Sequence, residues 1–170
     1  MIRSAQARDA AALAVIYNHY VCNTTVTFEE SPVTAEEMTR RLQAVQASGL
    51  PWLVTELDGK VLGYAYATKW KERSAYRFSA ECTIYLERTM HGRGLGKSLY
   101  RELLAVLADL GVHAVIGGIA QPNLASVGLH EKLGFRNVAL FREVGRKFDA
   151  WIDVGYWQRI LDGDLKDIRG

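Results

Sequence analysis

A strand, a glycine loop and a helix follow one another between Ile84 and Leu99, and this segment constrains the chain more than any other. A β-rich run from Cys82 to Leu86 ends in a polar turn, after which glycine recurs at every second position, as Gly92, Gly94 and Gly96. Such a loop can point several backbone N–H groups into one small volume at a helix N-terminus, which carries about half a positive charge. Three glycines also weaken local order and require a reason. The segment therefore predicts a binding site for a di- or polyphosphate.

Two familiar phosphate loops do not fit this segment. GxxxxGK[ST] would require glycine in place of His91, and a later apolar strand ending in aspartate, which the run HAVIGGIA lacks. The dinucleotide fingerprint GxGxxG differs from the GxGxG found here, and Ile116 and Gly117 stand where its acidic residue is expected. Coenzyme A is then the favoured ligand, with Arg93 and Lys97 adding positive charge. The alternative is a glycine-rich helix entry that binds no ligand.

Three separated motifs resemble one known family. The HGRGLG segment is similar to the (Q/R)xxGx(G/A) acetyl-CoA loop of the GCN5-related N-acetyltransferases (GNAT), with His91 at the usual Gln or Arg position, and PNLASVGLHEKLGF matches their second signature. IYNHY, YRFSAECTIYL and VGRKFDAWIDVGYWQ resemble the branch that acetylates phosphinothricin and methionine sulfoximine. The resemblance covers nearly the whole chain. It implies an α/β (α+β) GNAT fold, with a mixed, mostly antiparallel central sheet flanked by helices and a splayed strand at the acetyl-CoA site.

Length and composition limit the partners. We expect residues 1–170 to form a single N-acetyltransferase domain, long enough to bury its own core. A net charge of +2 without a long Lys/Arg run argues against nucleic acid, and no apolar segment approaches the roughly 20 residues that span a bilayer. The two cysteines and four histidines show no metal-ligand spacing, so no metal is expected. Two isolated thiols suit a reducing cytosol, and we expect a cytoplasmic protein.

Hydrophobic periodicity and turn residues predict the secondary structure. Asp9 is expected to cap a first helix, and Thr34 and Glu37 to form a capping box for a second. Further helices are predicted from about Gly94 to Leu110 and from Pro122 to Leu133. Strands are predicted over Ile2–Gln6, Trp52–Leu57, Lys60–Thr68, Tyr76–Leu86, Val112–Ile119, Phe135–Phe141 and Trp151–Ile160.

Glu81 is the candidate general base for acetyl transfer to an amine. It lies in a strand of otherwise apolar or small residues, where a carboxylate should have a raised pKa suited to a base working near neutral pH. The resemblance also places a glutamate here. The alternative is an outward-facing glutamate, because alternation alone does not say which face it occupies. An acetyl-cysteine at the adjacent Cys82 is less favoured, since neighbouring strand residues point to opposite faces.

The resemblance implies most of the remaining cofactor site. His130 stands where many relatives carry a tyrosine that protonates the coenzyme thiolate, although a helix histidine is often only packed. Asn123 can cap its helix, while the resemblance assigns it to the pantetheine amide. The edge of the strand Thr83–Leu86 can present backbone groups to the pantetheine arm. The expected cofactor-binding residues are Tyr85, Leu86, Glu87, Arg93, Gly94, Leu95, Gly96, Lys97, Ser98, Asn123 and Ser126, and side chains at Gly94 or Gly96 are expected to occupy the phosphate site.

A basic segment before Glu81 predicts the substrate class. Arginine there would suit a small substrate bearing a carboxylate or phosphinate, and a solvated basic turn is the alternative. The expected substrate-binding residues are Phe28, Arg73, Ala75, Tyr76, Arg77 and Lys147. The favoured function is acetylation of the α-amino group of a small amino-acid-like compound by direct attack of the amine. Acetylation of a protein N-terminus or lysine, and a non-catalytic acyl-CoA-binding module, are the alternatives. The branch resemblance also implies a homodimer.

Overall fold

The computed structural model describes residues 1–90 and 92–161, so the question of the role of His91 lies outside the described residues. The strands are β1 Ile2–Ser4, β2 Trp52–Leu57, β3 Lys60–Lys69, β4 Ser79–Leu86, β5 Ala114–Ala120, β6 Arg136–Lys147 and β7 Ala150–Ile160. The α-helices are α1 Ala10–Asn23, α2 Ala35–Ala47, α3 Leu95–Asp109 and α4 Leu124–Lys132. Short 3-10 turns cover Ala7–Asp9, Ser74–Tyr76 and Arg88–Met90.

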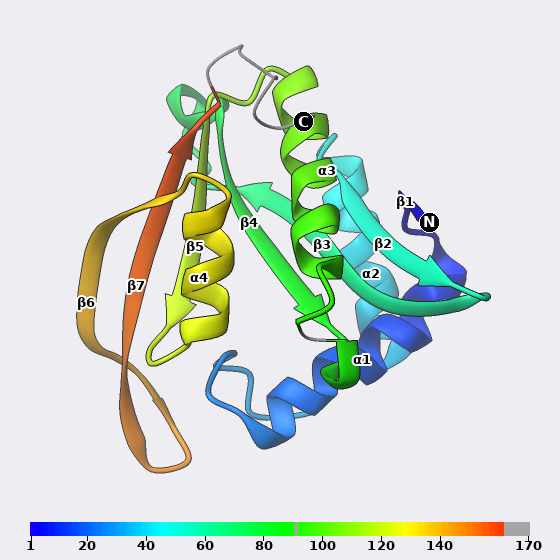
Figure 1. Cartoon of the computed structure of the whole chain (residues 1–170), viewed down its shortest axis with the longest axis horizontal. Helices are drawn as coiled ribbons and strands as arrows, with labels where there is room; N and C mark the ends of the chain where they lie inside the picture. Colours follow the sequence, from blue (N-terminus) through cyan, green and yellow to red (C-terminus); the bar gives the residue numbers. More distant parts are fainter. Residues whose placement is uncertain (91, 162–170) are drawn as a thin grey trace.

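The strands form one mixed sheet in the order β1-β2-β3-β4-β5-β7-β6. Every neighbouring pair is antiparallel except β4 and β5, which are parallel. Figure 1 shows α1 and α2 behind the sheet, and α3 and α4 in front of it. The predicted mixed, mostly antiparallel sheet flanked by helices is confirmed. Among the described residues, none of the helices has the length and apolarity to cross a bilayer.

Local signals explain the element boundaries. Thr34 caps α2 by accepting a hydrogen bond from the Glu37 amide at 3.1 Å, which is one half of the predicted capping box. The Glu37 carboxylate instead pairs with Arg40 and Arg41, three and four residues along the same helix. This pairing replaces the reciprocal bond of the box.

The β2–β3 hairpin turns through Asp58 and Gly59, whose φ angles of 50° and 77° are those of the tight turn that Asp-Gly favours. Two predicted strands, β4 and β6, differ from the observed ones by three residues or more at one end. β4 begins at Ser79 and not at Tyr76, because the preceding residues close a 3-10 turn in which the Arg77 amide donates to the Ser74 carbonyl. A tight turn followed by an extended strand cannot be told from one longer strand by composition.

β6 continues to Lys147, six residues beyond its predicted end at Phe141. A bulge between Phe141 and Gly145 breaks the alternation that sequence reasoning relied on. At the bulge Glu143 has φ of 53°, and its amide donates to the Asp153 carboxylate at 2.8 Å. β6 and β7 therefore form a long hairpin that projects from the sheet (Figure 1).

The sheet separates two apolar cores. One lies under α3 and α4, and the other lies under α1 and α2. Ala80 and Cys82 of β4 belong to the first core, whereas Tyr85 packs against the second. Because strand residues alternate between faces, Glu81 lies on the α1–α2 side of the sheet. The two cores thus show which face of the sheet Glu81 occupies, which alternation along the strand alone does not decide.

Candidate active site

β4 and β5 separate within the sheet. Their ladder runs from the pair Ser79–Ala114 to the pair Glu81–Ile116, and beyond it the two strands diverge (Figure 1). A cavity of about 340 Å³ lies at this divergence. Its lining includes Cys82, Thr83, Ile84, Tyr85 and Leu86 of β4, Gly118, Ile119 and Ala120 of β5, and Asn123, Ser126 and His130 at α4. The β4 edge after Glu81 is left without a β5 partner and can pair with an amide-bearing chain.

The glycine loop prepares the N-terminus of α3. Gly92 and Gly94 have φ of 77° and 80°, a left-handed conformation that favours glycine, and an added Cβ at either would meet nothing within 4 Å. Gly94 is the N-cap, and its carbonyl accepts the Ser98 amide at 3.1 Å. The amides of residues 95–97 therefore have no partner within the helix and remain available to an anion. Side chains at Arg93, Lys97 and Ser98 are exposed beside them.

Gly96 has a different reason to be glycine. It is buried, and an added Cβ would lie 3.1 Å from the Leu86 side chain and 3.6 Å from that of Leu129. The expectation that a side chain at Gly96 would fill the phosphate site is wrong, because its Cα faces the packing between α3 and β4. Only its amide can serve a phosphate.

The end of β4 is held by α1. The Tyr20 hydroxyl donates to the Leu86 carbonyl at 2.5 Å, and the rings of Tyr17 and Tyr20 pack against Tyr85 at 5.1 and 5.2 Å. The Glu87 amide donates to the Leu62 carbonyl at 2.8 Å, outside the residues that line the cavity. These contacts fix the strand edge that forms one wall.

The Glu81 carboxylate lies beside the cavity on the α1–α2 side. An added Cβ at the cavity-lining Gly118 would stand 3.2 Å from Glu81 Oε1 and 3.3 Å from the Tyr156 ring. Burial raises the Glu81 pKa above its usual value, and the positive charge of Lys71 opposes that rise. Glu81 is thus a half-buried carboxylate whose affinity for a proton is increased.

His130 approaches the cavity from the opposite side of the sheet. It is buried on α4, with Nδ1 2.8 Å from the Ser126 carbonyl and Nε2 3.0 Å from the Tyr100 hydroxyl. Burial lowers its pKa, and the hydrogen bond to the Ser126 carbonyl opposes this. An added Cβ at Gly117 would stand 2.5 Å from Nε2, so β5 needs glycine there. Glu81 and His130 therefore flank the divergence of β4 and β5 from its two faces.

Asn123 begins α4, where its side chain accepts the Ser126 amide at 3.1 Å. This cap uses the side-chain oxygen of Asn123, a residue that lines the cavity, and does not use its side-chain NH2 group. Among residues 1–90 and 92–161, His, Cys, Asp and Glu form no group of three that could hold a metal ion.

Comparison with known proteins identifies the family to which a site with this geometry belongs. A family model described as the acetyltransferase (GNAT) domain matches residues 2–155. The chain belongs to the GNAT family. Its members' acyltransferase activity agrees with the divergent strands and the glycine loop, and the predicted family and enzyme class are confirmed.

Relatives narrow the branch. The chain is 42% identical over 158 residues to a phosphinothricin N-acetyltransferase of Streptomyces viridochromogenes, covering 93% of this chain and 86% of that one. It is 35% identical over 161 residues to an L-methionine sulfoximine/L-methionine sulfone acetyltransferase of Salmonella typhimurium, covering 95% and 94%. A phosphinothricin acetyltransferase from Sinorhizobium meliloti, solved with acetyl-CoA, superposes with a TM-score of 0.91 at 36% identity and covers 95% and 88%. Acetyl-CoA is accordingly the co-substrate of this GNAT enzyme.

The predicted substrate residues of this GNAT enzyme fall into two groups. Arg73, Ala75, Tyr76 and Arg77 are exposed in the turn before β4, at the end where β4 and β5 are still paired. Arg77 lies over the Phe78 ring at 4.4 Å and donates to the Ser74 carbonyl. Neither arginine is among the charges that perturb Glu81, whereas Lys71 is. The cation that acts on Glu81 is therefore Lys71, which was not among the predicted substrate-binding residues.

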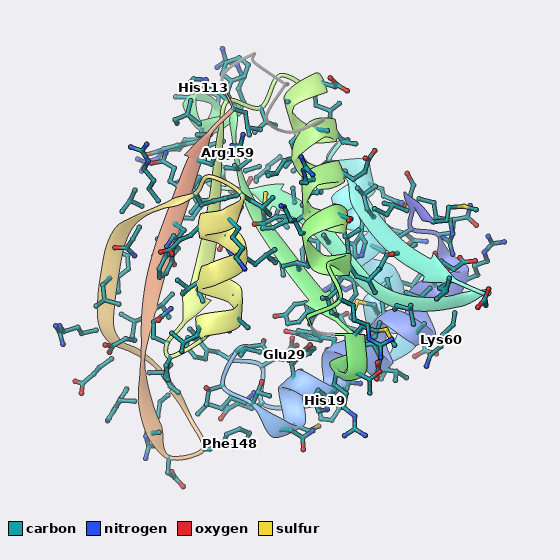
Figure 2. The ribbon with its side chains drawn as sticks, viewed as in Figure 1. His19, Glu29, Lys60, His113, Phe148 and Arg159 are labelled. Carbon is teal, nitrogen blue, oxygen red and sulfur yellow. The ribbon has the colours of Figure 1, made fainter. Side chains whose placement is uncertain are left out.

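Phe28 and Lys147 form the second group. Lys147 is 2% exposed, and its Nζ donates to the Thr27 carbonyl at 2.8 Å. The Phe28 ring lies so close to Gly145 that an added Cβ there would stand 2.3 Å from it. The loop after α1 and the β6–β7 hairpin therefore meet at these residues; Figure 2 shows Phe148 at the lower end of that hairpin and Glu29 on the facing loop.

Sequence reasoning missed three side chains at this GNAT site. Tyr100 of α3 contacts His130, while Tyr156 of β7 and Trp70 lie together on the Glu81 side with their ring centroids 5.8 Å apart. Tyr100 and Tyr156 follow the apolar pattern of their elements, so both are typical of core residues. Only the glycine pair in HAVIGGIA signalled that something approaches β5 closely.

Proposed function

We propose that this protein transfers the acetyl group of acetyl-CoA to the α-amino group of a small amino-acid-like substrate. Methionine sulfoximine, methionine sulfone and phosphinothricin represent the class. The observation that most supports this proposal is the half-buried Glu81 carboxylate, which lies where β4 and β5 begin to separate. The substrates named for the relatives support the choice of class.

Glu81 is proposed to take the proton from the substrate ammonium, directly or through one water. A raised carboxylate pKa suits this role because it brings the base closer to neutral pH. Bound acetyl-CoA supplies the acetyl group as a thioester, held by the β4 edge and the amides at the start of α3. His130 is proposed to protonate the thiolate that leaves. Cys82 lies on the other face from Glu81, and burial raises its thiol pKa, which supports direct attack by the amine.

The substrate is proposed to lie on the Glu81 face of the sheet. Trp70 and Tyr156 offer aromatic surface on the side of the carboxylate, and Lys71, in the turn before β4, is the cation that acts on it. Phe28 and Lys147 are proposed to close the opposite wall. A compact basic turn favours a small anionic substrate over a long peptide, which would need an open groove.

Esterifying the substrate carboxylate tests whether the enzyme recognises the negative charge of that group. We expect methionine sulfone to be acetylated with a kcat/KM about 10- to 100-fold higher than that of its methyl ester, as for loss of a charged hydrogen bond in a closed site. An exposed ion pair would account for less than about 1 kcal/mol. Release of the coenzyme thiol, followed with a panel of amino acids, their esters and an N-terminal peptide, measures this.

Single alanine variants identify the cation responsible. Replacement of Arg73, Arg77 or Lys71 should narrow the gap between acid and ester, without changing the KM for acetyl-CoA. Lys60→Ala is the matched control, because Lys60 is an exposed cation at the start of β3, on a different hairpin (Figure 2). Equal kcat/KM for acid and ester would reject the carboxylate site, and efficient acetylation of the peptide would favour a protein substrate.

The protein is also proposed to be a homodimer through the β6–β7 hairpin. β6 is the last strand of the sheet, and large apolar side chains lie exposed on this hairpin: Val138, Leu140, Phe141, Val144, Phe148 and Trp151. Analytical ultracentrifugation should show twice the mass of the chain. Trp151→Glu should shift the protein towards monomer, whereas Leu57→Glu, on the distant β2, should not. A monomer at all concentrations would contradict the proposal.

A further inference from the structure

The buried side of the site contains a chain of three polar groups. Tyr100 is fully buried on α3, stacks on Phe135 at 5.6 Å and meets the His130 ring edge-on at 5.1 Å. Its hydroxyl lies 3.0 Å from His130 Nε2, and the Cys82 thiol lies close enough to interact with it. Both Cys82 and His130 line the cavity between β4 and β5. Tyr100 therefore connects two cavity-lining groups from behind.

The contacts of His130 fix which nitrogen carries the proton. A carbonyl can only accept, so the 2.8 Å contact with the Ser126 carbonyl requires a proton on Nδ1. In the neutral ring Nε2 is then an acceptor, and the Tyr100 hydroxyl must donate to it. This hydroxyl is held as a neutral donor, because burial raises the Tyr100 pKa well above 10.

A protonated ring would need an acceptor at Nε2 instead. The Tyr100 oxygen can accept that second proton if its own hydrogen turns towards the Cys82 sulfur. A phenylalanine at this place could serve neither state. Since a buried N–H without a partner is costly, above all on a charged group, the hydroxyl decides whether the ring can hold a second proton.

Few other groups that titrate face this ring. Tyr100 of α3 lies at Nε2, Ser126 of α4 lies at Nδ1, and Cys82 of β4 interacts with Tyr100. Glu81 acts on Tyr100 and Cys82 only through space, from the other face of β4. Glu131 and Lys132, next to the ring in sequence, are exposed. Gly117 of β5 and Phe135, the residue before β6, pack around the ring and carry no charge.

We propose that Tyr100 is a positioning residue for His130, holding the neutral ring with its proton on Nδ1 and reversing its hydrogen bond when Nε2 binds a second proton. The proposal deepens the proposed function, on which it rests for the use of that proton. As the thiolate takes the proton, the N–H bond at Nε2 breaks, an S–H bond forms, and the hydroxyl turns back to Nε2.

Nitrogen-15 NMR of the histidine rings tests this without reference to turnover. In the wild type, the His130 signals, assigned with His130→Gln, should report the Nδ1–H form at neutral pH. Tyr100→Phe should lower the His130 pKa by about one to two units, or let the Nε2–H form appear. The alkaline limb of the kcat–pH profile, set by loss of the proton that His130 donates, should move to lower pH by the same amount, and kcat should fall about 10- to 100-fold with KM for acetyl-CoA unchanged.

Two further variants keep the test decisive. Tyr64→Phe is the matched control, since Tyr64 is an equally buried tyrosine in the core on the other face, and it should leave the His130 signals unmoved. If Tyr100→Phe fails to fold, Cys82→Ala removes the acceptor for the turned hydroxyl and should lower the His130 pKa in the same direction. Unchanged His130 tautomer and titration in these variants would overturn the proposal. Altered titration without acetylation of any amino acid would leave it standing and reject the proposed function.

Discussion

Replacing Glu81 by glutamine is expected to lower kcat by about 100- to 10,000-fold, the usual effect of removing a general base. The amide cannot take the ammonium proton, whereas affinity for coenzyme A should be retained because the cavity lining and the α3 N-terminus are unchanged. Part of the loss should be recovered at high pH, where more of the substrate amine is already deprotonated. Thiol release measured against pH, with calorimetry of coenzyme A binding, tests both statements.

The same variant should be more stable than the wild type at neutral pH. Because burial raises the Glu81 pKa above 4.5, the folded state binds the proton more tightly than the unfolded state. The carboxylate therefore costs stability as the pH rises through its unfolded pKa, and that cost is fully present above the folded pKa. Glutamine removes the cost, so the difference in Tm should be largest at neutral pH and vanish in acid.

Glu102→Gln provides the control for this pair of measurements, since Glu102 is exposed on α3. It should change neither kcat nor the Tm at neutral pH. Full activity of Glu81→Gln at neutral pH would show that another group is the base. A lower Tm for Glu81→Gln at neutral pH would contradict the environment that the structure gives this carboxylate.

Gly94→Ala is expected to raise the Kd for coenzyme A by about 10- to 100-fold. The methyl group would enter open space at the N-cap of α3, where phosphate oxygens would meet the free amides, and loss of one charged hydrogen bond accounts for this magnitude. The left-handed φ of 80° would also cost about 1–2 kcal/mol of stability in any residue with a Cβ. Calorimetry and thermal unfolding separate the two effects.

Gly111→Ala is the matched control, because Gly111 follows the other end of α3 with φ of 78° and equally open surroundings. It should lose the same stability while the Kd stays unchanged. Gly96→Ala should disturb the packing between α3 and β4, because its Cβ would stand 3.1 Å from the Leu86 side chain and displace it. Equal Kd values for Gly94→Ala and Gly111→Ala would reject the phosphate assignment.

Local signals were enough for much of this protein. The glycine loop, the Asp-Gly hairpin and the caps at Thr34 and Asn123 depend on backbone conformation and short-range hydrogen bonds, which a stretch of sequence carries within itself. The family motifs predicted the sheet and the co-substrate, because the order and spacing of those motifs can be read directly from a single sequence. The bulge in β6 escaped, since its Glu143 is stabilised by Asp153 of another strand.

The arrangement of the site depended on contacts between distant segments. Glu81 and His130 are read from motifs, yet only the two cores show that they flank the sheet from opposite faces. Lys147 was predicted from the sequence as a substrate-binding residue, but its burial by the loop after α1 and its bond to Thr27 are visible only in the structure. The sequence alone determined which side chains could act as acid, base or phosphate-binding groups, because residue type and local backbone conformation depend on short stretches of the chain. Their burial, partners and hence proton affinities were decided by tertiary packing, which no local pattern records.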